Sequence, residues 1–440
     1  MFFNSFLQNV RAFPHKVAIR YLEEELTYAV LAERVQKRAL DYTDFSTRFW
    51  IISTDNPVIA LVDWLALMYL GKVGILAPKE WRNAYFQFFT EQNEVQSCRD
   101  VPERFVEYSP QTPVEVTEND LFVGILSSGS TGQPKLIWKD YQSWLSAFPA
   151  QSEVFGLHES DVLYLVDALA YSANANAALH MLWCGGTLHF TPVKDLAKPL
   201  PGEVTSLFLV PSHARIWVQH QSTPQIQLTS FFTAGEKLES TLASQLLRLL
   251  PNATLTEYYG AAELGHIAYH QNQSLVENPH QVGSPFPGVE ITLQGNQIYV
   301  QSPYISPDYR SIRTVGDLGV WENGALVLLG RQGRMFNRRG LNILAEEIEQ
   351  IAWEMPGLQD VLAIQVKPGK IWLLYVANES RTSSQWRQLF HAKLPKAKCP
   401  TFFKQVPFIP RTLAGKVDFR AAARLYAASE EDSFDFQEES

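Results

Sequence analysis

The segment Leu126-Ser-Ser-Gly-Ser-Thr-Gly-Gln-Pro-Lys135 decides how the rest of the chain is interpreted. It directly continues an apolar run that begins at Leu121 and is typical of a buried strand. Its glycines let the backbone approach a ligand closely, its hydroxyl groups offer hydrogen bonds, and its lysine adds a positive charge. An exposed Ser/Gly turn is the alternative interpretation, and the spacing does not match a Walker-type loop. The segment predicts a loop that grips a polyphosphate, formed by Ser127, Ser128, Gly129, Ser130, Thr131, Gly132 and Lys135.

Strand-like and helix-like patterns alternate around this segment. Ser206-Leu-Phe-Leu-Val210 is a second apolar run bounded by turn residues. From Glu236 to Leu250 leucines recur at helical spacing, and Pro251 follows, so we expect a helix there. Such alternation predicts an α/β fold with buried strands.

The pattern changes after Gly330. A helix is expected from Ala345 to Met355, followed by two apolar runs joined by Lys-Pro-Gly-Lys, which is typical of a hairpin. These features predict a small α+β domain behind a glycine-flanked hinge. The expected division is a large domain over residues 1–330, a hinge over 331–333, a small domain over 334–428 and an acidic disordered tail over 429–440.

Composition excludes several classes of protein. The 440 residues include 46 acidic and 37 basic side chains, and the net charge of −9 opposes binding to nucleic acid. Three cysteines without C-x-x-C spacing make a disulfide framework or a thiolate zinc site implausible, and they favour a cytoplasmic location. The longest apolar segment, from Pro57 to Gly74, contains charged residues and predicts a buried helix rather than a transmembrane segment. The N-terminus lacks the pattern of a secretory signal.

Further motifs follow the glycine-rich segment in a fixed order. They are Ala234-Gly235-Glu236, Tyr258-Tyr-Gly-Ala-Ala-Glu263, Gly316-Asp317, Gly330-Arg331, Arg339-Gly-Leu-Asn-Ile343 and Pro410-Arg-Thr-Leu-Ala-Gly-Lys416. Together they resemble the ANL superfamily of adenylate-forming enzymes, which includes acyl-CoA synthetases, adenylation domains of peptide synthetases and luciferases. Weaker matches near Tyr28 and Gly71 extend the resemblance over nearly the whole chain.

The resemblance implies a large N-terminal domain of mixed β-sheets packed with helices, and a small mobile C-terminal domain. It also implies an AMP-forming acid–thiol ligase that uses ATP and Mg²⁺. Two anions must meet in that reaction, so cations are needed where charge builds up. By resemblance, Lys416 bridges the substrate carboxylate and the α-phosphate, and Glu263 holds the Mg²⁺. In isolation, either residue would be read as an ordinary surface side chain.

The resemblance also implies how the nucleotide is bound. Asp317 would accept hydrogen bonds from the ribose hydroxyls, Arg331 would donate to the same sugar, and Tyr259 would lie against adenine. The remaining nucleotide-binding candidates are Ala234, Gly235, Glu236, Tyr258 and Gly260.

The substrate acid remains open at this point. The acyl pocket implied by the resemblance includes Tyr171, Ser172, Phe232, Ala261 and Leu264. Ser172 stands where family members that activate α-amino acids commonly have aspartate, so an aryl or aliphatic acid is favoured. Two nearby asparagines, at positions 174 and 176, are candidates either for contacts with the substrate or for turns and caps.

The second half-reaction would involve the C-terminal domain. The hinge residue is Gly333, and the face presented to the thiol would include Arg339, Gly340 and Asn342. The acceptor is CoA or the phosphopantetheine of a carrier protein, with CoA favoured.

The chain departs from the family pattern at several positions, namely Leu136, Ala262, Gly333 and Asn337. The family usually has Thr or Ser where this chain has Ala262, and one hydrogen bond to a charged group is worth about 1.5–3 kcal/mol. Slow turnover is therefore one expectation. Two other classes of function are the alternatives: a nucleotide-binding relative without catalysis, and a scaffold protein.

Overall fold

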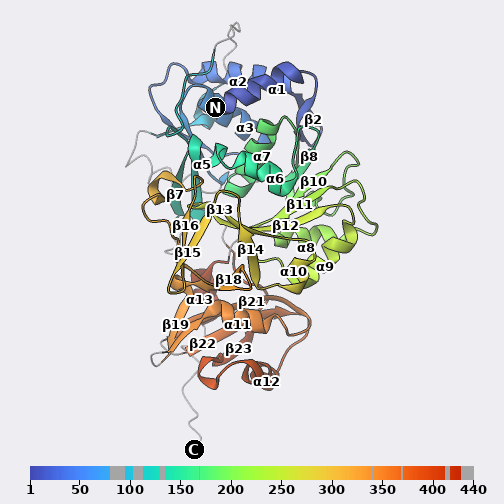
Figure 1. Cartoon of the computed structure of the whole chain (residues 1–440), viewed down its shortest axis with the longest axis vertical. Helices are drawn as coiled ribbons and strands as arrows, with labels where there is room; N and C mark the ends of the chain where they lie inside the picture. The colour runs from blue at the N-terminus through green and yellow to red at the C-terminus, as the bar shows by residue number, and fades with distance from the viewer. Residues whose placement is uncertain are drawn as a thin grey trace, which may run out of the picture.

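The computed structural model describes residues 1–79, 95–102, 112–128, 134–167, 169–338, 341–367, 370–411 and 417–427. The N-terminal three quarters contain two large sheets with helices packed on them, and the C-terminal quarter forms a smaller body at one end of the molecule (Figure 1). The predicted α/β fold class is confirmed. The acidic tail predicted for residues 429–440 lies outside the described residues.

The larger N-terminal sheet runs in the order β15-β16-β17-β18-β14-β13-β12-β11-β10-β8-β9-β1-β2 among the described residues. Its central strands β8, β10, β11 and β12 are parallel, and β12 then turns back into antiparallel β13. The bounds are β1 Val17–Tyr21, β2 Glu24–Thr27, β8 Val162–Val166, β9 Thr187–Thr191, β10 Ser206–Phe208, β11 Ser230–Thr233, β12 Thr254–Ala261, β13 Gly265–Gln271, β14 Gln281–Pro285, β15 Glu290–Gln294, β16 Gln297–Gln301, β17 Asp317–Glu322 and β18 Ala325–Arg331.

The second N-terminal sheet has the order β5-β3-β4-β6-β7. Strands β3, β4, β5 and β6 are parallel, whereas β7 returns antiparallel to β6 after the glycine-rich segment. Their bounds are β3 Phe49–Ile52, β4 Val73–Leu76, β5 Val95–Ser97, β6 Leu121–Ser128 and β7 Pro134–Asp140.

Helices cover these sheets. Helix α3 is mostly apolar and buried, with the single charged residue Asp63 paired to Arg38, and Asn56 caps it by accepting hydrogen bonds from the backbone N–H groups of Val58 and Ile59. In the part of the chain that the structure describes, no helix has the length and apolarity needed to cross a membrane. The N-terminal helices are α1 Phe2–Ala12, α2 Tyr28–Tyr42, α3 Pro57–Tyr69, α5 Tyr141–Leu145, α6 Phe148–Phe155, α7 Ser172–Cys184, α8 Pro211–Gln219, α9 Ser240–Leu249 and α10 Ser274–Glu277, with the 3₁₀ turn η4 at Pro307–Tyr309.

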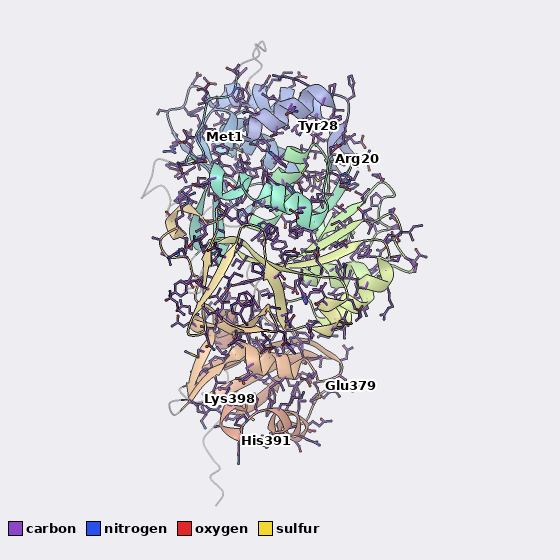
Figure 2. The ribbon with its side chains drawn as sticks, viewed as in Figure 1. Met1, Arg20, Tyr28, Glu379, His391 and Lys398 are labelled. Carbon is purple, nitrogen blue, oxygen red and sulfur yellow. The ribbon has the colours of Figure 1, made fainter. Side chains whose placement is uncertain are left out.

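The C-terminal body has its own core, centred on Trp386 and Phe390. The expected hairpin forms as β21 and β22, which pair antiparallel. Figure 2 places Glu379, His391 and Lys398 at this end, opposite Met1 and Tyr28. Its elements are η5 Gln332–Arg334, β19 Met335–Arg338, β20 Leu341–Leu344, α11 Ala345–Ala352, β21 Leu358–Lys367, β22 Lys370–Ala377, α12 Ser383–Lys393, β23 Phe402–Gln405 and α13 Phe419–Ala427.

Two helix predictions were wrong at one end. The helix expected from Glu236 begins at Ser240, because Glu257 holds the preceding backbone by accepting a hydrogen bond from Leu238 N at 2.7 Å. The helix expected to reach Met355 ends at Ala352, ahead of Pro356, because a residue before proline is disfavoured in the helical conformation.

Candidate active site

The phosphate-loop candidates lie between β6 and β7. Backbone pairing places Ser127 opposite Lys135 and Ser128 opposite Pro134, next to the connection between the two strands. Gly129, Ser130, Thr131 and Gly132 fall outside the described residues. The strand expected before this segment is present as β6, and the grip on phosphate stays a prediction.

Lys135 is held by a residue far away in the sequence. Its ammonium donates a hydrogen bond to the Tyr309 hydroxyl and lies 4.6 Å from the centroid of the same ring. The next residue, Arg310, donates to the buried Asp140 at 2.5 Å. These contacts fasten η4 to β7 at both ends of the strand, which motif analysis did not predict.

The adenine-side candidates follow β11. Ala234 is buried, Gly235 has a φ of +88° that favours glycine, and the Glu236 carboxylate accepts hydrogen bonds from the backbone N–H and the hydroxyl of Ser212 at 3.2 Å each. Because β11 and β12 are parallel neighbours, this loop lies beside the end of β12. The carboxyl ends of parallel strands are where such folds bind ligands.

The β12–β13 hairpin brings the next motif together. A Cβ at Gly260 would come 2.6 Å from the carbonyl oxygen of Gly265, so only glycine fits this tight pairing. Leu264 is buried, and the backbone oxygen of Glu263 accepts a hydrogen bond from Ser306 N at 2.9 Å. The Glu263 side chain is half-buried at the turn.

Glu263 fits the predicted Mg²⁺ in one respect. Mg²⁺ is usually held by one or two carboxylates together with substrate phosphates, rather than by a full set of protein ligands. Glu263 supplies one such carboxylate, half-buried at the β12–β13 turn, and among the described residues no group of three or more metal-ligating side chains occurs. When bound with ATP, such an ion would neutralise phosphate charge.

The two ribose candidates, Asp317 and Arg331, form a compact polar group with Tyr259, the adenine candidate. Asp317 and Arg331 are paired across β17 and β18, and Arg331 Nε lies 2.7 Å from Asp317 Oδ1. The Tyr259 hydroxyl donates to Asp317 Oδ2. Burial raises the pKa of Tyr259 well above its usual value, and the Asp317 carboxylate raises it further, so Tyr259 stays a donor. The group presents a buried carboxylate that two donors orient.

The acyl-pocket candidates lie on β11, on the β12–β13 hairpin and at the start of α7. Phe232 is buried and its ring stacks on Phe155, with centroids 4.5 Å apart. Tyr171 is the N-cap of α7 and Ser172 its first residue, both half-buried, and Ala261 is the half-buried last residue of β12.

The two asparagines on α7 have different surroundings. Asn174 Nδ2 donates to the carbonyl of Val166 at 2.9 Å, so its side chain ties α7 to the end of β8. This is a structural use, in line with the alternative to a substrate contact. Asn176 is also buried, two residues further along the helix.

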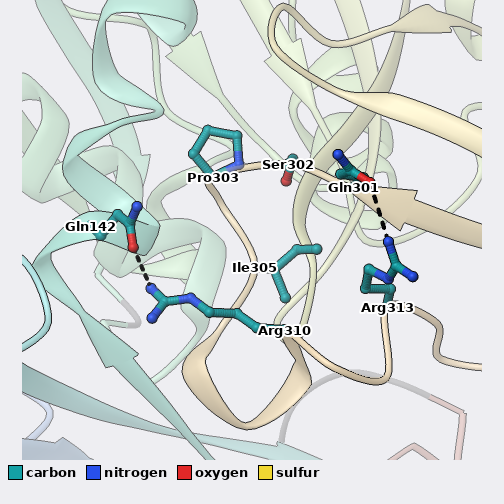
Figure 3. A pocket seen from close by; sticks show the side chains of 7 residues that line it. All are labelled: Gln142, Gln301, Ser302, Pro303, Ile305, Arg310 and Arg313. Atoms are coloured by element: carbon teal, nitrogen blue, oxygen red, sulfur yellow. Dashed lines mark hydrogen bonds between the residues drawn. The ribbon is translucent and has the colours of Figure 1, made fainter.

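A pocket of about 340 Å³ lies beside η4 and contains none of the predicted site residues. In the wall of this pocket, Arg310 donates a hydrogen bond to Gln142 at 2.8 Å and Arg313 donates one to Gln301 at 3.1 Å (Figure 3). Both guanidinium groups are thus engaged with protein partners.

Comparisons with known proteins identify the family of the chain. The AMP-binding enzyme family matches residues 71–301, which is just over half of the chain. The chain belongs to this family. A putative long chain fatty acid-CoA ligase of Staphylococcus epidermidis is 23% identical over 93% of this chain and 94% of its own length. A D-alanine–D-alanyl carrier protein ligase of the same organism is 23% identical over 94% and 96%.

The solved structures support the same fold. O-succinylbenzoate coenzyme A synthetase from Bacillus subtilis in complex with AMP has a TM-score of 0.82 at 17% identity, covering 95% of this chain and 97% of its own. Its complex with ATP and a magnesium ion has a TM-score of 0.81 at 17% identity, covering 95% and 98%. The predicted superfamily is therefore confirmed, and AMP-forming acid–thiol ligation agrees with the activities named for these relatives.

In this AMP-binding enzyme the hinge candidate Gly333 lies in η5, and a Cβ there would meet open space. Its neighbour Arg334 pairs with Glu346 at 2.9 Å and Glu349 at 2.6 Å, and its guanidinium lies 4.4 Å from the Phe419 ring centroid. Arg334 is thus held by residues of the C-terminal domain. Gly333, directly before it, has no atom of the described residues near enough to restrict an added Cβ.

The remaining C-terminal candidates are only partly described. Asn342 pairs with Asn337 through the backbone of β19 and β20, whereas Arg339 and Gly340 lie outside the described residues. Lys416 does too, but Arg411 and Val417 on either side of it form an antiparallel bridge. The roles of these residues stay predictions.

Lys139 is a charged residue of the site region that the motifs did not reveal. Its side chain is fully buried in β7, and its ammonium has no hydrogen-bond partner among the described residues. Burial lowers its pKa to about 7, against the opposing effects of Glu263 and Asp140. Lys139 also contributes, after burial and His180, to the lowered pKa of His266, which is about 3. Lys139 stands two residues after Ile137 in the strand and therefore shares its buried face, which was the signal available in the sequence.

We expect Lys139→Met to stabilise the protein most below pH 7. The folded-state pKa lies below the unfolded value of 10.5, so the unfolded state binds more protons between about pH 7 and 10.5, and stability rises with pH there. Methionine fills the same space without the charge. Thermal unfolding at pH 6.5 should show a Tm higher by roughly 2–6 °C. That gain should shrink by pH 9.5, and an equal gain at both pH values would contradict the assignment.

Proposed function

We propose that this AMP-binding enzyme joins a carboxylic acid to ATP, forms an acyl-adenylate with release of pyrophosphate, and transfers the acyl group to the thiol of CoA. The observation that carries the proposal is the buried Asp317 carboxylate, held by Tyr259 and Arg331 beside the β12–β13 turn that bears Glu263. A charged acceptor oriented in this way suits the two adjacent hydroxyls of a ribose.

The other residues have separate tasks in this proposal. Lys135 and the preceding glycine-rich segment hold the phosphates, with Lys135 oriented by Tyr309. Glu263 would hold Mg²⁺ with the phosphates. Lys416 approaches the reacting carboxylate and α-phosphate, where its charge offsets the repulsion between two anions.

The proposed substrate is a small aryl or aliphatic acid. Ser172, the first residue of α7, has a hydroxyl where an amine-binding site would have a carboxylate. Phe232 and the two rings stacked on it provide an apolar surface for the substrate. An ammonium group on the substrate would therefore lack a charged partner among these candidates.

The relatives include both CoA ligases and a carrier protein ligase, so transfer to a phosphopantetheine thiol is the second candidate. We favour CoA because the Gly340-Leu-Asn-Ile343 segment resembles that of CoA ligases. We place the reaction in the cytoplasm, since all three cysteines are unpaired.

Mass spectrometry of acyl-adenylates formed from an acid library tests the proposal. The purified protein is incubated with ATP, Mg²⁺ and each acid, and then CoA or a holo-carrier protein is added. We expect an adenylate with at least one acid, and its loss upon addition of the correct thiol. Binding of ATP without pyrophosphate release from any acid would instead favour a non-catalytic relative.

Ala262→Thr is expected to raise the rate of ATP–pyrophosphate exchange about three- to tenfold. The Ala262 carbonyl is held by the Ser306 hydroxyl at 3.1 Å, so the backbone is already placed and only the side-chain donor is missing. A hydroxyl that contacts the adenylate phosphate more strongly in the transition state raises kcat. Ala262→Val, which has the same branching without a hydroxyl, is the control. Equal rates for the two variants would contradict the explanation.

A further inference from the structure

Arg411 bridges the two domains at the base of the segment that carries Lys416. Its Nη1 lies 3.4 Å from Glu236 Oε1 on the large domain, and its Nη2 lies 2.9 Å from Asp360 Oδ2 on β21 of the small domain. One guanidinium thus contacts a carboxylate from each domain. The planar fork of arginine suits such a double contact better than the point charge of lysine.

The partner on the large domain is fixed in place. Glu236 follows Gly235 at the end of β11, and both of its oxygens accept hydrogen bonds from Ser212 at the first turn of α8. The Glu236 side chain is 28% exposed, so the pair is partly shielded from solvent. Arg411 therefore docks against the loop assigned to the adenine side of the site.

The bridge is also tied to the catalytic segment. Asp418 N donates to the carbonyl of Pro410 at 2.8 Å, and Arg411 pairs with Val417. These backbone contacts pair the described residues that flank positions 412–416, and Arg411 is one of them. A contact that fixes Arg411 therefore also restrains Val417, its backbone partner.

We propose that Arg411 is a positioning residue for adenylation: by joining Glu236 to Asp360, it holds the small domain in the arrangement that directs the Lys416 segment at the nucleotide site. This inference rests on the proposed function. If the second half-reaction uses another face of the small domain, the bridge must open between the two steps. Arg411 then matters for the first step and not for the second.

The expected effect is moderate because partly exposed ion pairs are individually weak. Loss of the bridge shifts a population of domain arrangements without removing a reacting group. We expect the kcat of ATP–pyrophosphate exchange to fall roughly 5- to 20-fold. For loss of Lys416 a much larger fall is expected, and this difference distinguishes the two roles.

Arg411→Gln tests the proposal by measuring the two half-reactions separately. ATP–pyrophosphate exchange, with an acid that the wild type activates, should fall 5- to 20-fold in kcat. Formation of the thioester from chemically prepared acyl-adenylate and CoA should stay the same or rise up to threefold. The matched control is Lys393→Gln, which removes the same charge from a pair with Glu354 inside the small domain at 2.6 Å and should change neither rate. Equal losses in both half-reactions would overturn the proposal.

Glu236→Gln provides the coupling test. Its amide oxygen can still accept from Ser212, whereas the charge that holds Arg411 is gone. We expect exchange to fall as in Arg411→Gln and to fall no further in the double variant, because both changes break the same bridge. Additive losses, or exchange within twofold of the wild type in either single variant, would refute the bridge as the cause.

Limited trypsin digestion gives a readout that does not need activity. If the bridge holds the domains, Arg411→Gln should be cleaved faster than the wild type within the hinge at Arg331 to Arg334, while Lys393→Gln should not. If Arg411→Gln is cleaved in the hinge at the same rate as the wild type, the inference is overturned, whatever the exchange rate of the variant. Conversely, normal exchange in a Lys416→Ala variant would defeat the proposed function and leave the cleavage result standing.

Discussion

Lys416→Ala is expected to lower ATP–pyrophosphate exchange by at least about 100-fold, while the affinity for ATP changes by less than about threefold. The physical reason is the charge that accumulates when a carboxylate attacks the α-phosphate. A fixed cation aimed at that charge acts chiefly in the transition state, so its removal lowers kcat more than it weakens nucleotide binding. Exchange at saturating acid and ATP measures the first effect, and protection by ATP in a thermal melt measures the second.

The second half-reaction is the internal control for Lys416. Thioester formation from preformed acyl-adenylate and CoA does not need this cation in the proposed sequence of steps, so it should stay within about threefold of the wild type. Retained thioester formation also demonstrates that the variant is folded. Near-normal exchange in Lys416→Ala would remove the lysine from the mechanism.

Motifs identified residues that the structure brings together in one place. Asp317, Arg331 and Tyr259 come from three separate motifs, and the structure joins them in one hydrogen-bonded group. The sequence could place them because each lies at a strand end in a recognisable order. The α/β class followed from the alternation of apolar runs and helical spacing in the same way.

Contacts made by residues outside the recognised motifs could not be predicted. Tyr309 holds Lys135 from a position 174 residues away, and Ser212 anchors Glu236 across 24 residues, yet neither stands in a recognisable motif. Such partners depend on how loops from different strands approach one another, which periodicity does not encode. Lys139 was missed for the opposite reason, because a lysine in a strand is normally solvated.

The late start of α9 has a similar origin. Leucine spacing favoured a helix from Glu236, but the local pattern carries no information about Glu257 on β12, which holds Lys237 at 2.6 Å and the backbone of Leu238. The tertiary contact takes precedence because these residues gain charge-assisted hydrogen bonds that the first turn of a helix would not offer.

Glu263→Gln is expected to lower exchange about 100-fold at 1 mM Mg²⁺ and to raise the Mg²⁺ concentration needed for half-maximal rate by roughly tenfold. Glutamine keeps the size of the side chain and the backbone contact with Ser306, but it lacks the charge that a hard cation prefers. The measurement is a titration of exchange with Mg²⁺ at fixed ATP, and Glu322→Gln, at an exposed end of β17, is the matched control. If Glu263 only maintained the fold, the variant would lose thermal stability and its Mg²⁺ requirement would be unchanged.

A Lys139 variant separates the effect of Glu263 on the charge of Lys139 from its effect on Mg²⁺ binding. Glu263 raises the pKa of Lys139 against the larger effect of burial, so removing the carboxylate leaves the buried ammonium less compensated. Glu263→Gln should therefore be less stable than the wild type at pH 6.5, and adding Lys139→Met should restore the Tm without restoring the Mg²⁺ dependence. Recovery of normal Mg²⁺ dependence in the double variant would mean that Glu263 acts through Lys139 and not on the metal.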